Sequence, residues 1–224
     1  MLSDIRNNID FAIRNFTKFS RKNFVETDAS LIERNIQENL YITDILEQGF
    51  KKQSLKKTFI LDIGSKNWFY AKGEYNFFKS FCDDFELDGI ELDAYRLYSN
   101  FYSRFEVAKY YIKDLKNTNY IAGNLLDIDK KYDYIIWILP FVVKEPHFKW
   151  GLPKKYFYPE KLLHHAFSLL KSNGQMLIIN QGEAEALVQK ELLNKLNIPY
   201  KNLGKISSEH FQYKNKRFGV LINK

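Results

Sequence analysis

The sequence predicts an α/β protein built on a doubly wound, mostly parallel sheet of seven strands. From Thr58 onward, short apolar runs alternate with longer segments whose apolar residues have helical spacing, and this alternation is typical of a parallel sheet. The run over 132–139 is almost entirely apolar, as expected for a strand that helices cover on both faces. The last two expected strands could form a hairpin-like pair. We therefore expect a C-terminal strand that runs antiparallel to the rest of the sheet.

Each expected element follows from its composition and spacing. Strands are expected where apolar runs are bounded by turn residues, at 58–63, 85–92, 119–124, 132–139, 175–180, 200–206 and 217–224. Helices are expected where apolar residues recur every three or four positions, at 67–81, 106–115, 159–174 and 183–196. Gly174 is expected to end the third of these helices.

The part of the chain before the first strand reads as a helical extension. We therefore expect two units, an N-terminal helical extension over 1–57 and a Rossmann-like domain over 58–224. Apolar residues with helical spacing form two stripes, one of Ile5, Ile9, Ile13 and Phe16 and one of Ile32, Ile36 and Leu40. Ser30 and Glu33 fit a capping box ahead of the second stripe, although Thr27 or Asp28 could cap instead.

Composition narrows the class of protein. The chain of 224 residues is 45% hydrophobic and 27% charged, which indicates a globular protein, and its single cysteine excludes an internal disulfide. No apolar run approaches the roughly 20 residues of a membrane span, so we expect a cytoplasmic protein with no membrane contact. The net charge of +7 includes basic clusters at 51–57 and 214–217. These could meet RNA phosphates or could form a solvated surface.

Polar residues follow the first three expected strands. They are Asp62, Gly64, Ser65 and Asn67 after the first, Glu91 and Asp93 after the second, and Asn124 with Leu125 after the third. In open parallel sheets, ligands bind at the carboxyl ends of the strands. Gly64 would let a ligand approach the backbone, Glu91 suits the two hydroxyls of a ribose, and the Asn124 amide suits an adenine edge. Asn67 is expected to cap a helix that begins at Trp68.

In order and spacing, these residues resemble the motifs of the class I S-adenosylmethionine-dependent methyltransferases, over roughly residues 58–224. The family's first motif, an acidic residue followed by three alternating glycines, falls on Asp62, Gly64, Lys66 and Trp68. Its ribose-binding acid falls on Glu91, and its third motif falls on 123–127 with Asn124 in the place of aspartate. The family's leucine, lysine and glycine before a strand fall within 169–180.

The resemblance implies a cofactor and a reaction. It implies that S-adenosylmethionine is bound by Asp62, Gly64, Ser65, Glu91, Asn124 and Leu125, and that its methyl group passes to a small molecule or an RNA. Only the first glycine of the family's first motif is present, because Lys66 and Trp68 replace the others. The alternative is therefore a non-catalytic ligand-binding or scaffolding protein on the same fold. A nicotinamide dehydrogenase is a weaker alternative, since the loop has too few glycines for a pyrophosphate.

The long segment after the fourth strand is expected to form the acceptor wall. In the family, residues after this strand face the methyl group, and here the segment 141–158 is rich in prolines and aromatic residues. Candidate acceptor-binding residues are Pro140, Phe141, Trp150, Tyr156 and, after the fifth strand, Gln181. His147 is the candidate general base, although a lone loop histidine is more often exposed to solvent and idle. His164 and His165 have no ligand partners at a suitable spacing, so no metal site is expected.

Overall fold

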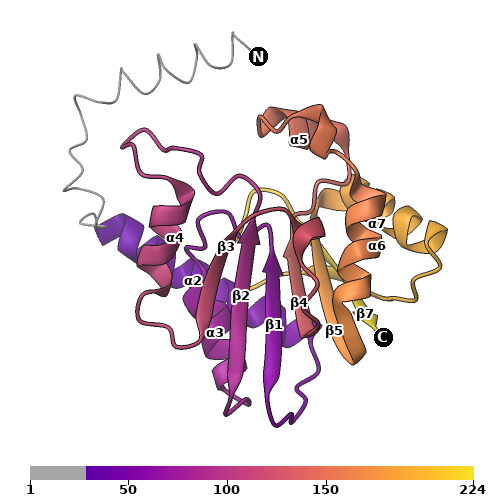
Figure 1. Cartoon of the computed structure of the whole chain (residues 1–224), viewed down its shortest axis with the longest axis horizontal. Helices are drawn as coiled ribbons and strands as arrows, with labels where there is room; N and C mark the ends of the chain where they lie inside the picture. Colours follow the sequence, from indigo (N-terminus) through magenta and orange to yellow (C-terminus); the bar gives the residue numbers. More distant parts are fainter. Residues whose placement is uncertain (1–28) are drawn as a thin grey trace.

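The computed structural model describes residues 29–224 and confirms the predicted α/β architecture (Figure 1). Its strands are β1 (Thr58–Ile63), β2 (Phe85–Glu91), β3 (Thr118–Ala122), β4 (Tyr132–Ile138), β5 (Leu170–Gln181), β6 (Lys201–Ile206) and β7 (Arg217–Asn223). Its α-helices are α2 (Ala29–Gly49), α3 (Ala71–Lys79), α4 (Arg104–Ile112), α5 (Lys144–Lys149), α6 (Pro159–Leu169) and α7 (Gly182–Lys195). Short 3₁₀ helices lie at Leu125–Asp127 and Lys154–Tyr156.

The seven strands form one sheet in the order β3-β2-β1-β4-β5-β7-β6. The neighbouring pairs among β1 to β5 are all parallel, so their carboxyl ends meet at one edge of the sheet. Strand β7 runs antiparallel between β5 and β6, which confirms the expected C-terminal hairpin-like pair. Its first residue, Arg217, pairs with Gln181 at the carboxyl end of β5. The start of β7 therefore lies at the same edge as the expected ligand site.

Alternate residues of the central strands face two different layers of helices. Ile60, Ile136 and Leu177 belong to one buried cluster with residues of α2, α3 and α4. Leu61 and Ile178 belong to a second cluster with residues of α6 and α7. This period-two alternation buries both faces of the sheet, as expected for parallel strands that helices connect.

The helix expected to begin at Trp68 begins instead at Ala71, and Asn67 does not cap it. Trp68 has a φ of 47°, which is outside the helical region, and its ring is fully buried. The N-terminus of α3 is capped from another helix, because the backbone N–H of Gly73 donates to Asn39 Oδ1 in α2 at 2.7 Å. The tertiary packing of Trp68 therefore overrides the local capping pattern.

The helix expected over 159–174 ends at Leu169, so Gly174 does not end it. The next residues extend β5, and Leu170 pairs with Tyr132 of β4. The backbone N–H of Asn173 donates to the carbonyl of Lys224 at 2.6 Å, and the N–H of Lys224 donates to the carbonyl of Gly174. Pairing with the distant C-terminus therefore replaces the last turn of the expected helix.

The second apolar stripe does not form the buried face of α2. Ile32, Ile36 and Leu40 are 42%, 55% and 41% exposed, and the residues that α2 buries against the sheet are Tyr41, Ile42, Ile45 and Leu46. The helix begins at Ala29, so Ser30 lies within its first turn and the expected capping box is wrong. The stripe of residues 5–16 and the alternative caps at positions 27 and 28 lie outside the described residues. Over 29–224, none of the helices has the length and apolar character that a bilayer crossing requires.

Candidate functional site

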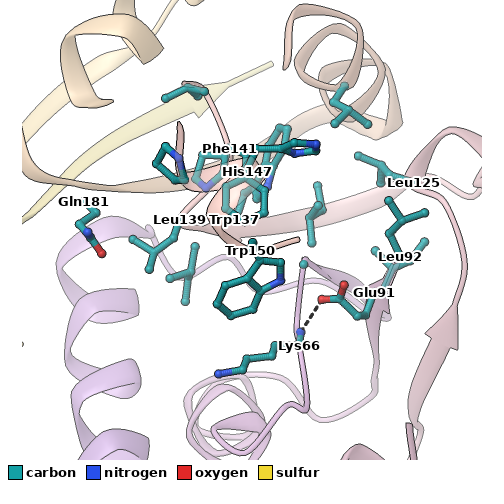
Figure 2. A pocket seen from close by; sticks show the side chains of 18 of the residues that line it. Lys66, Glu91, Leu92, Leu125, Trp137, Leu139, Phe141, His147, Trp150 and Gln181 are labelled. Carbon is teal, nitrogen blue, oxygen red and sulfur yellow. Dashed lines mark hydrogen bonds between the residues drawn. The ribbon is translucent and has the colours of Figure 1, made fainter. Parts of the chain in front are cut away.

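A cavity of about 750 Å³ lies at the carboxyl ends of the parallel strands (Figure 2). Its walls come from the loops after β1, β2, β3, β4 and β5, from α2, and from the segment that contains α5. Most of the residues expected to bind a cofactor or an acceptor line it, namely Gly64, Glu91, Asn124, Leu125, Pro140, Phe141, His147, Trp150, Tyr156 and Gln181. The fold thus brings residues from distant parts of the sequence to one place.

The loop after β1 keeps the backbone of a glycine-rich loop with only one of its three glycines. Gly64, Lys66 and Trp68 have φ angles of 74°, 55° and 47°, all in the left-handed region. These are the three positions at which the family has glycine, the residue that adopts this region at least cost. A Cβ on Gly64 would meet no atom within 4 Å, so the space in front of this residue is open. That space suits a ligand in contact with the backbone.

Trp68 points away from the cavity and into the protein core. The indole N–H donates to Glu74 Oε2 at 2.9 Å, and both side chains are fully buried. Lys66 behaves differently, because its side chain lines the cavity and its Nζ lies 5.2 Å from the ring centre of Trp150. Burial lowers the pKa of Lys66, and the nearby Arg104 guanidinium lowers it further. Only one of the two substituted glycines therefore places a side chain beside the ligand space.

Glu91 is held at the edge of the cavity by two backbone N–H groups. Its Oε2 accepts from the N–H of Lys66 at 2.9 Å, and its Oε1 accepts from the N–H of Asp93 at 2.8 Å. Arg104 Nη1 lies 3.9 Å from Oε1. Each carboxylate oxygen can accept a second hydrogen bond, so the oriented carboxylate can still bind a pair of hydroxyls.

Asn124 lines the cavity next to Leu125, and its amide already has two partners. The Oδ1 accepts from the backbone N–H of Leu126 at 3.1 Å, and the Nδ2 donates to the Tyr158 hydroxyl at 3.1 Å. One Nδ2 hydrogen is therefore left for a ligand. Leu92 and Leu125 add apolar walls on the same side of the cavity (Figure 2).

Asp62 and Ser65 lie behind the loop and do not line the cavity. Asp62 is fully buried, and its Oδ2 accepts from the Tyr70 hydroxyl at 2.9 Å. Burial raises the pKa of Asp62 to about 7, against the lowering effect of the Tyr70 hydrogen bond, and the Glu91 charge adds to the rise. Ser65 Oγ and Asp62 Oδ1 have no hydrogen-bond partner among residues 29–224. Neither side chain is therefore placed to contact a ligand in the cavity.

Trp150 lies beside the loop after β1, at the cavity end that Glu91 occupies (Figure 2). The Arg104 guanidinium carbon lies 4.9 Å from its ring centre, so two cations, those of Lys66 and Arg104, lie over this indole. Arg96 donates to the Trp150 carbonyl and pairs with Asp93 at 2.6 Å. The sequence did not point to Arg96 or Arg104, because only the fold brings the loop after β2 against the segment after β4.

His147 is 2% exposed and lies within a group of aromatic rings. Its ring centre lies 5.5 Å from that of Phe141 and 5.3 Å from that of Phe157. The Nε2 lies 3.1 Å from the Pro153 carbonyl, which can only accept, so this nitrogen carries the proton. The geometry shows a packed histidine at the cavity wall, and its role as a base stays a prediction.

The far end of the cavity contains a residue that the sequence did not single out. Figure 2 shows Gln181 on the opposite side of the cavity from Glu91, with Leu139 and Trp137 between them. Beside Gln181 lies Arg217, whose Nη1 is 3.4 Å from Gln181 Oε1. In sequence, Arg217 is one member of a basic cluster, and only the β5–β7 register brings it into the cavity. Over 29–224, no three His, Cys, Asp or Glu side chains meet at a metal-binding geometry.

The strand order and the left-handed loop after β1 define the Rossmann-like fold of the class I S-adenosylmethionine-dependent methyltransferases. A methyltransferase from Aquifex aeolicus is similar, with a TM-score of 0.59 and 15% identity over 88% of this chain and 98% of that one. Precorrin-6y C5,15-methyltransferase from Geobacter metallireducens has a TM-score of 0.54, with 10% identity over 81% and 86%.

A third similar structure, the plantazolicin methyltransferase BpumL in complex with SAH, has a TM-score of 0.51, with 16% identity over 86% of this chain and 84% of that one. No protein-family model matches the sequence, and no curated protein is similar to it. At these identities the likeness establishes the fold, and the expected resemblance is confirmed at that level.

Proposed function

We propose that the protein transfers a methyl group from S-adenosylmethionine to a small molecule bound in the same cavity. The observation that carries the proposal is the backbone of the loop after β1. All three positions that correspond to glycines keep left-handed φ angles, although two of them carry side chains for which this region is costly. A loop that had become a mere connection would have no reason to retain this conformation.

The residues of the chain provide binding and orientation. Glu91 would accept the ribose hydroxyls, Gly64 would let the ligand lie against the backbone, and Asn124 with Leu125 would hold the adenine. The cofactor supplies a methyl group on a sulfonium, which a nucleophile attacks in line. The protein's main contribution to such a displacement is to hold the acceptor in that line and to exclude water.

The substitutions at Lys66 and Trp68 are the main support for a non-catalytic ligand-binding protein. The burial of Trp68 weakens that alternative, because this side chain does not obstruct the cavity. Lys66 leaves Gly64 open and contacts Trp150 instead. A nicotinamide dinucleotide is less well supported, since Asn39 already accepts from the Gly73 N–H in the first turn of α3, where a pyrophosphate would bind.

The positions of the basic clusters favour a small acceptor over RNA. Residues 51–57 precede β1 and therefore lie toward the amino ends of the parallel strands. Residues 214–217 lead into β7, whose first residue is Arg217, and lie at the carboxyl edge, where Arg217 lines the cavity. An RNA that followed both clusters would have to pass from one end of the sheet to the other. A cavity of about 750 Å³ is in the range of small-molecule sites.

The proposal is tested by methyl transfer from S-adenosylmethionine that carries a labelled methyl group. The full chain is incubated in parallel with a small-metabolite extract and with total RNA, and the Glu91→Ala variant is the control. Label that enters the small-molecule fraction, and depends on Glu91, is the expected result. Label in RNA alone would assign the other acceptor class. Tight cofactor binding with no label in either fraction would favour the non-catalytic alternative.

A further inference from the structure

Arg217 is a buried cation with no acidic partner in the described part of the chain. Its side chain lines the cavity, and the residue is 8% exposed. Within residues 29–224, no Asp or Glu oxygen lies within 4.0 Å of its guanidinium. The hydrogen bonds of the guanidinium go from Nη1 to the Asn215 carbonyl at 3.1 Å and to Gln181 Oε1 at 3.4 Å. Burial of a charge without a counter-charge is costly, so the site is suited to a ligand that brings one.

The surrounding carboxylates are already engaged elsewhere. Glu185 Oε2 accepts from the backbone N–H of Gln181 at 3.1 Å, and burial raises its pKa although Arg217 opposes the rise. Glu38 is 5% exposed, pairs with Arg34 at 3.2 Å and accepts from the Tyr213 hydroxyl at 3.3 Å. Neither carboxylate neutralises Arg217 by direct contact.

The guanidinium is held in place before any ligand arrives. Its carbon lies 4.5 Å from the ring centre of Tyr213, and its backbone is fixed by the pairing of β7 with β5. Another polar group of the cavity wall lacks a partner: Gln189 in α7 is 1% exposed, and its Nε2 has no hydrogen-bond acceptor among the residues described. A guanidinium has five N–H donors, so Arg217 has donors left for a ligand beyond its bonds to Asn215 and Gln181.

We propose that Arg217 binds a carboxylate or phosphate group of the methyl acceptor, and that the rest of the acceptor is apolar. The inference rests on the proposed methyl transfer. Trp137, Leu139 and Leu192 line the cavity and give it apolar walls. The anionic group anchors the acceptor at the Gln181 end, while the cofactor occupies the Glu91 end, which Figure 2 shows across the cavity from Gln181. A guanidinium pairs with either oxyanion through two parallel hydrogen bonds.

The experiment uses three probes of similar shape: benzoate, phenyl phosphate and the neutral benzamide. Their binding to the full chain is followed by ligand-observed NMR, with and without saturating S-adenosylhomocysteine. We expect benzoate or phenyl phosphate to bind at least about tenfold more tightly than benzamide, because charge-assisted hydrogen bonds are much the stronger ones. The preferred probe of the two tells whether the acceptor carries a carboxylate or a phosphate.

Arg217→Gln should remove the preference for the anionic probes, whereas Arg217→Lys should retain part of it. Arg34→Gln is the matched control, because Arg34 lines the same cavity but is paired with Glu38 and has a side chain that is 59% exposed. Equal binding of benzoate, phenyl phosphate and benzamide to the wild type would overturn the proposal without any variant. Displacement of benzoate by S-adenosylhomocysteine would also overturn it, because Arg217 would then bind the cofactor's own carboxylate.

The two proposals fail separately in this design. Binding of S-adenosylhomocysteine with no preference for the anionic probes would remove the anion site and leave the proposed reaction intact. A preference for the anionic probes that Arg217→Gln abolishes, in a protein that does not bind S-adenosylhomocysteine, would establish the anion site and remove the proposed reaction.

Discussion

The indole ring of Trp68 lies against the backbone of Gly89 in β2, at a distance that no other residue at position 89 would permit. A Cβ on Gly89 would lie 2.8 Å from atoms of this ring. Trp68 is fully buried there, and its N–H is bonded to Glu74. Gly89 in β2 thus leaves room for the Trp68 side chain, which stands at a position where the loop would otherwise have glycine.

Gly89→Ala should therefore destabilise the protein. The new methyl group would displace a ring that is buried on all sides, and overpacking of this kind costs about 1–3 kcal/mol. Gly123→Ala is the matched control, because a Cβ there would come no closer than 4.0 Å to another residue. Urea unfolding of both variants gives the comparison. Equal stability of Gly89→Ala and the wild type would show that the Trp68 ring is free to move.

Glu91→Ala should weaken the binding of S-adenosylhomocysteine by about 1.5–3 kcal/mol, the contribution of hydrogen bonds to a charged group. The variant also frees the backbone N–H of Lys66, so the loop itself should loosen. Calorimetry measures the affinity. Asp127→Ala, which removes an exposed carboxylate that does not line the cavity, should leave the affinity unchanged. Unchanged affinity in folded Glu91→Ala would remove Glu91 from the site.

Asp62→Asn should gain stability relative to the wild type as the pH rises. Because burial raises the pKa of Asp62 to about 7 from 3.8, folded Asp62 holds its proton across this window while unfolded Asp62 loses it. The wild type therefore loses stability as the pH rises from about 4 to about 7, and asparagine removes this loss. Urea unfolding of both proteins at about pH 4.5 and about pH 8 measures the difference. An identical difference in stability at both pH values would show that folding does not raise the pKa of Asp62.

Trp150→Ala should expose the segment around α5 to proteolysis. The two cations over its ring each contribute about 0.5–2 kcal/mol, so their loss should speed tryptic cleavage after Lys149 and Lys154 by about tenfold. Tyr156→Ala is the control, because Tyr156 lies in the same segment and the one cation–π contact of its ring among residues 29–224 is with the neighbouring Lys155. If both variants were cleaved at the wild-type rate, Trp150 would not anchor this segment.

Local patterns were sufficient to predict the sheet and one end of the site. Strands such as β4 are almost entirely apolar, and the polar residues that follow β1 and β2 must meet because parallel strands share an edge. Gly64 and Glu91 could be found in this way. The start of α3 could not, because the left-handed turn at Trp68 depends on the absence of a side chain at Gly89, in another strand.

Contacts between distant segments account for the rest. Arg104 reaches Trp150 only because the loop after β2 meets the segment after β4, and Arg217 reaches Gln181 only through the antiparallel register of β7. The stripe at Ile32 and Ile36 was expected to be buried but is exposed, so the sequence pattern also failed to predict which face of α2 packs on the protein. Helical spacing identified the helix, but the face that α2 buries is chosen by its packing on α3 and the sheet.

The central claim is that the open space in front of Gly64 holds an adenosyl cofactor. Gly64 and Gly182 have nearly the same φ angles, 74° and 75°, and a Cβ on either would meet no atom within 4 Å. Alanine at either position therefore carries a similar backbone cost, but only at position 64 would the methyl group enter the cofactor's proposed position.

The decisive measurement is a calorimetric titration of the wild type, Gly64→Ala and Gly182→Ala with S-adenosylhomocysteine, with NAD as the competing ligand. The account predicts one bound S-adenosylhomocysteine per wild-type chain and no binding of NAD. It also predicts an affinity at least about tenfold lower in Gly64→Ala, while Gly182→Ala binds like the wild type. No binding of S-adenosylhomocysteine to the folded wild type, or equal binding to all three proteins, would contradict it.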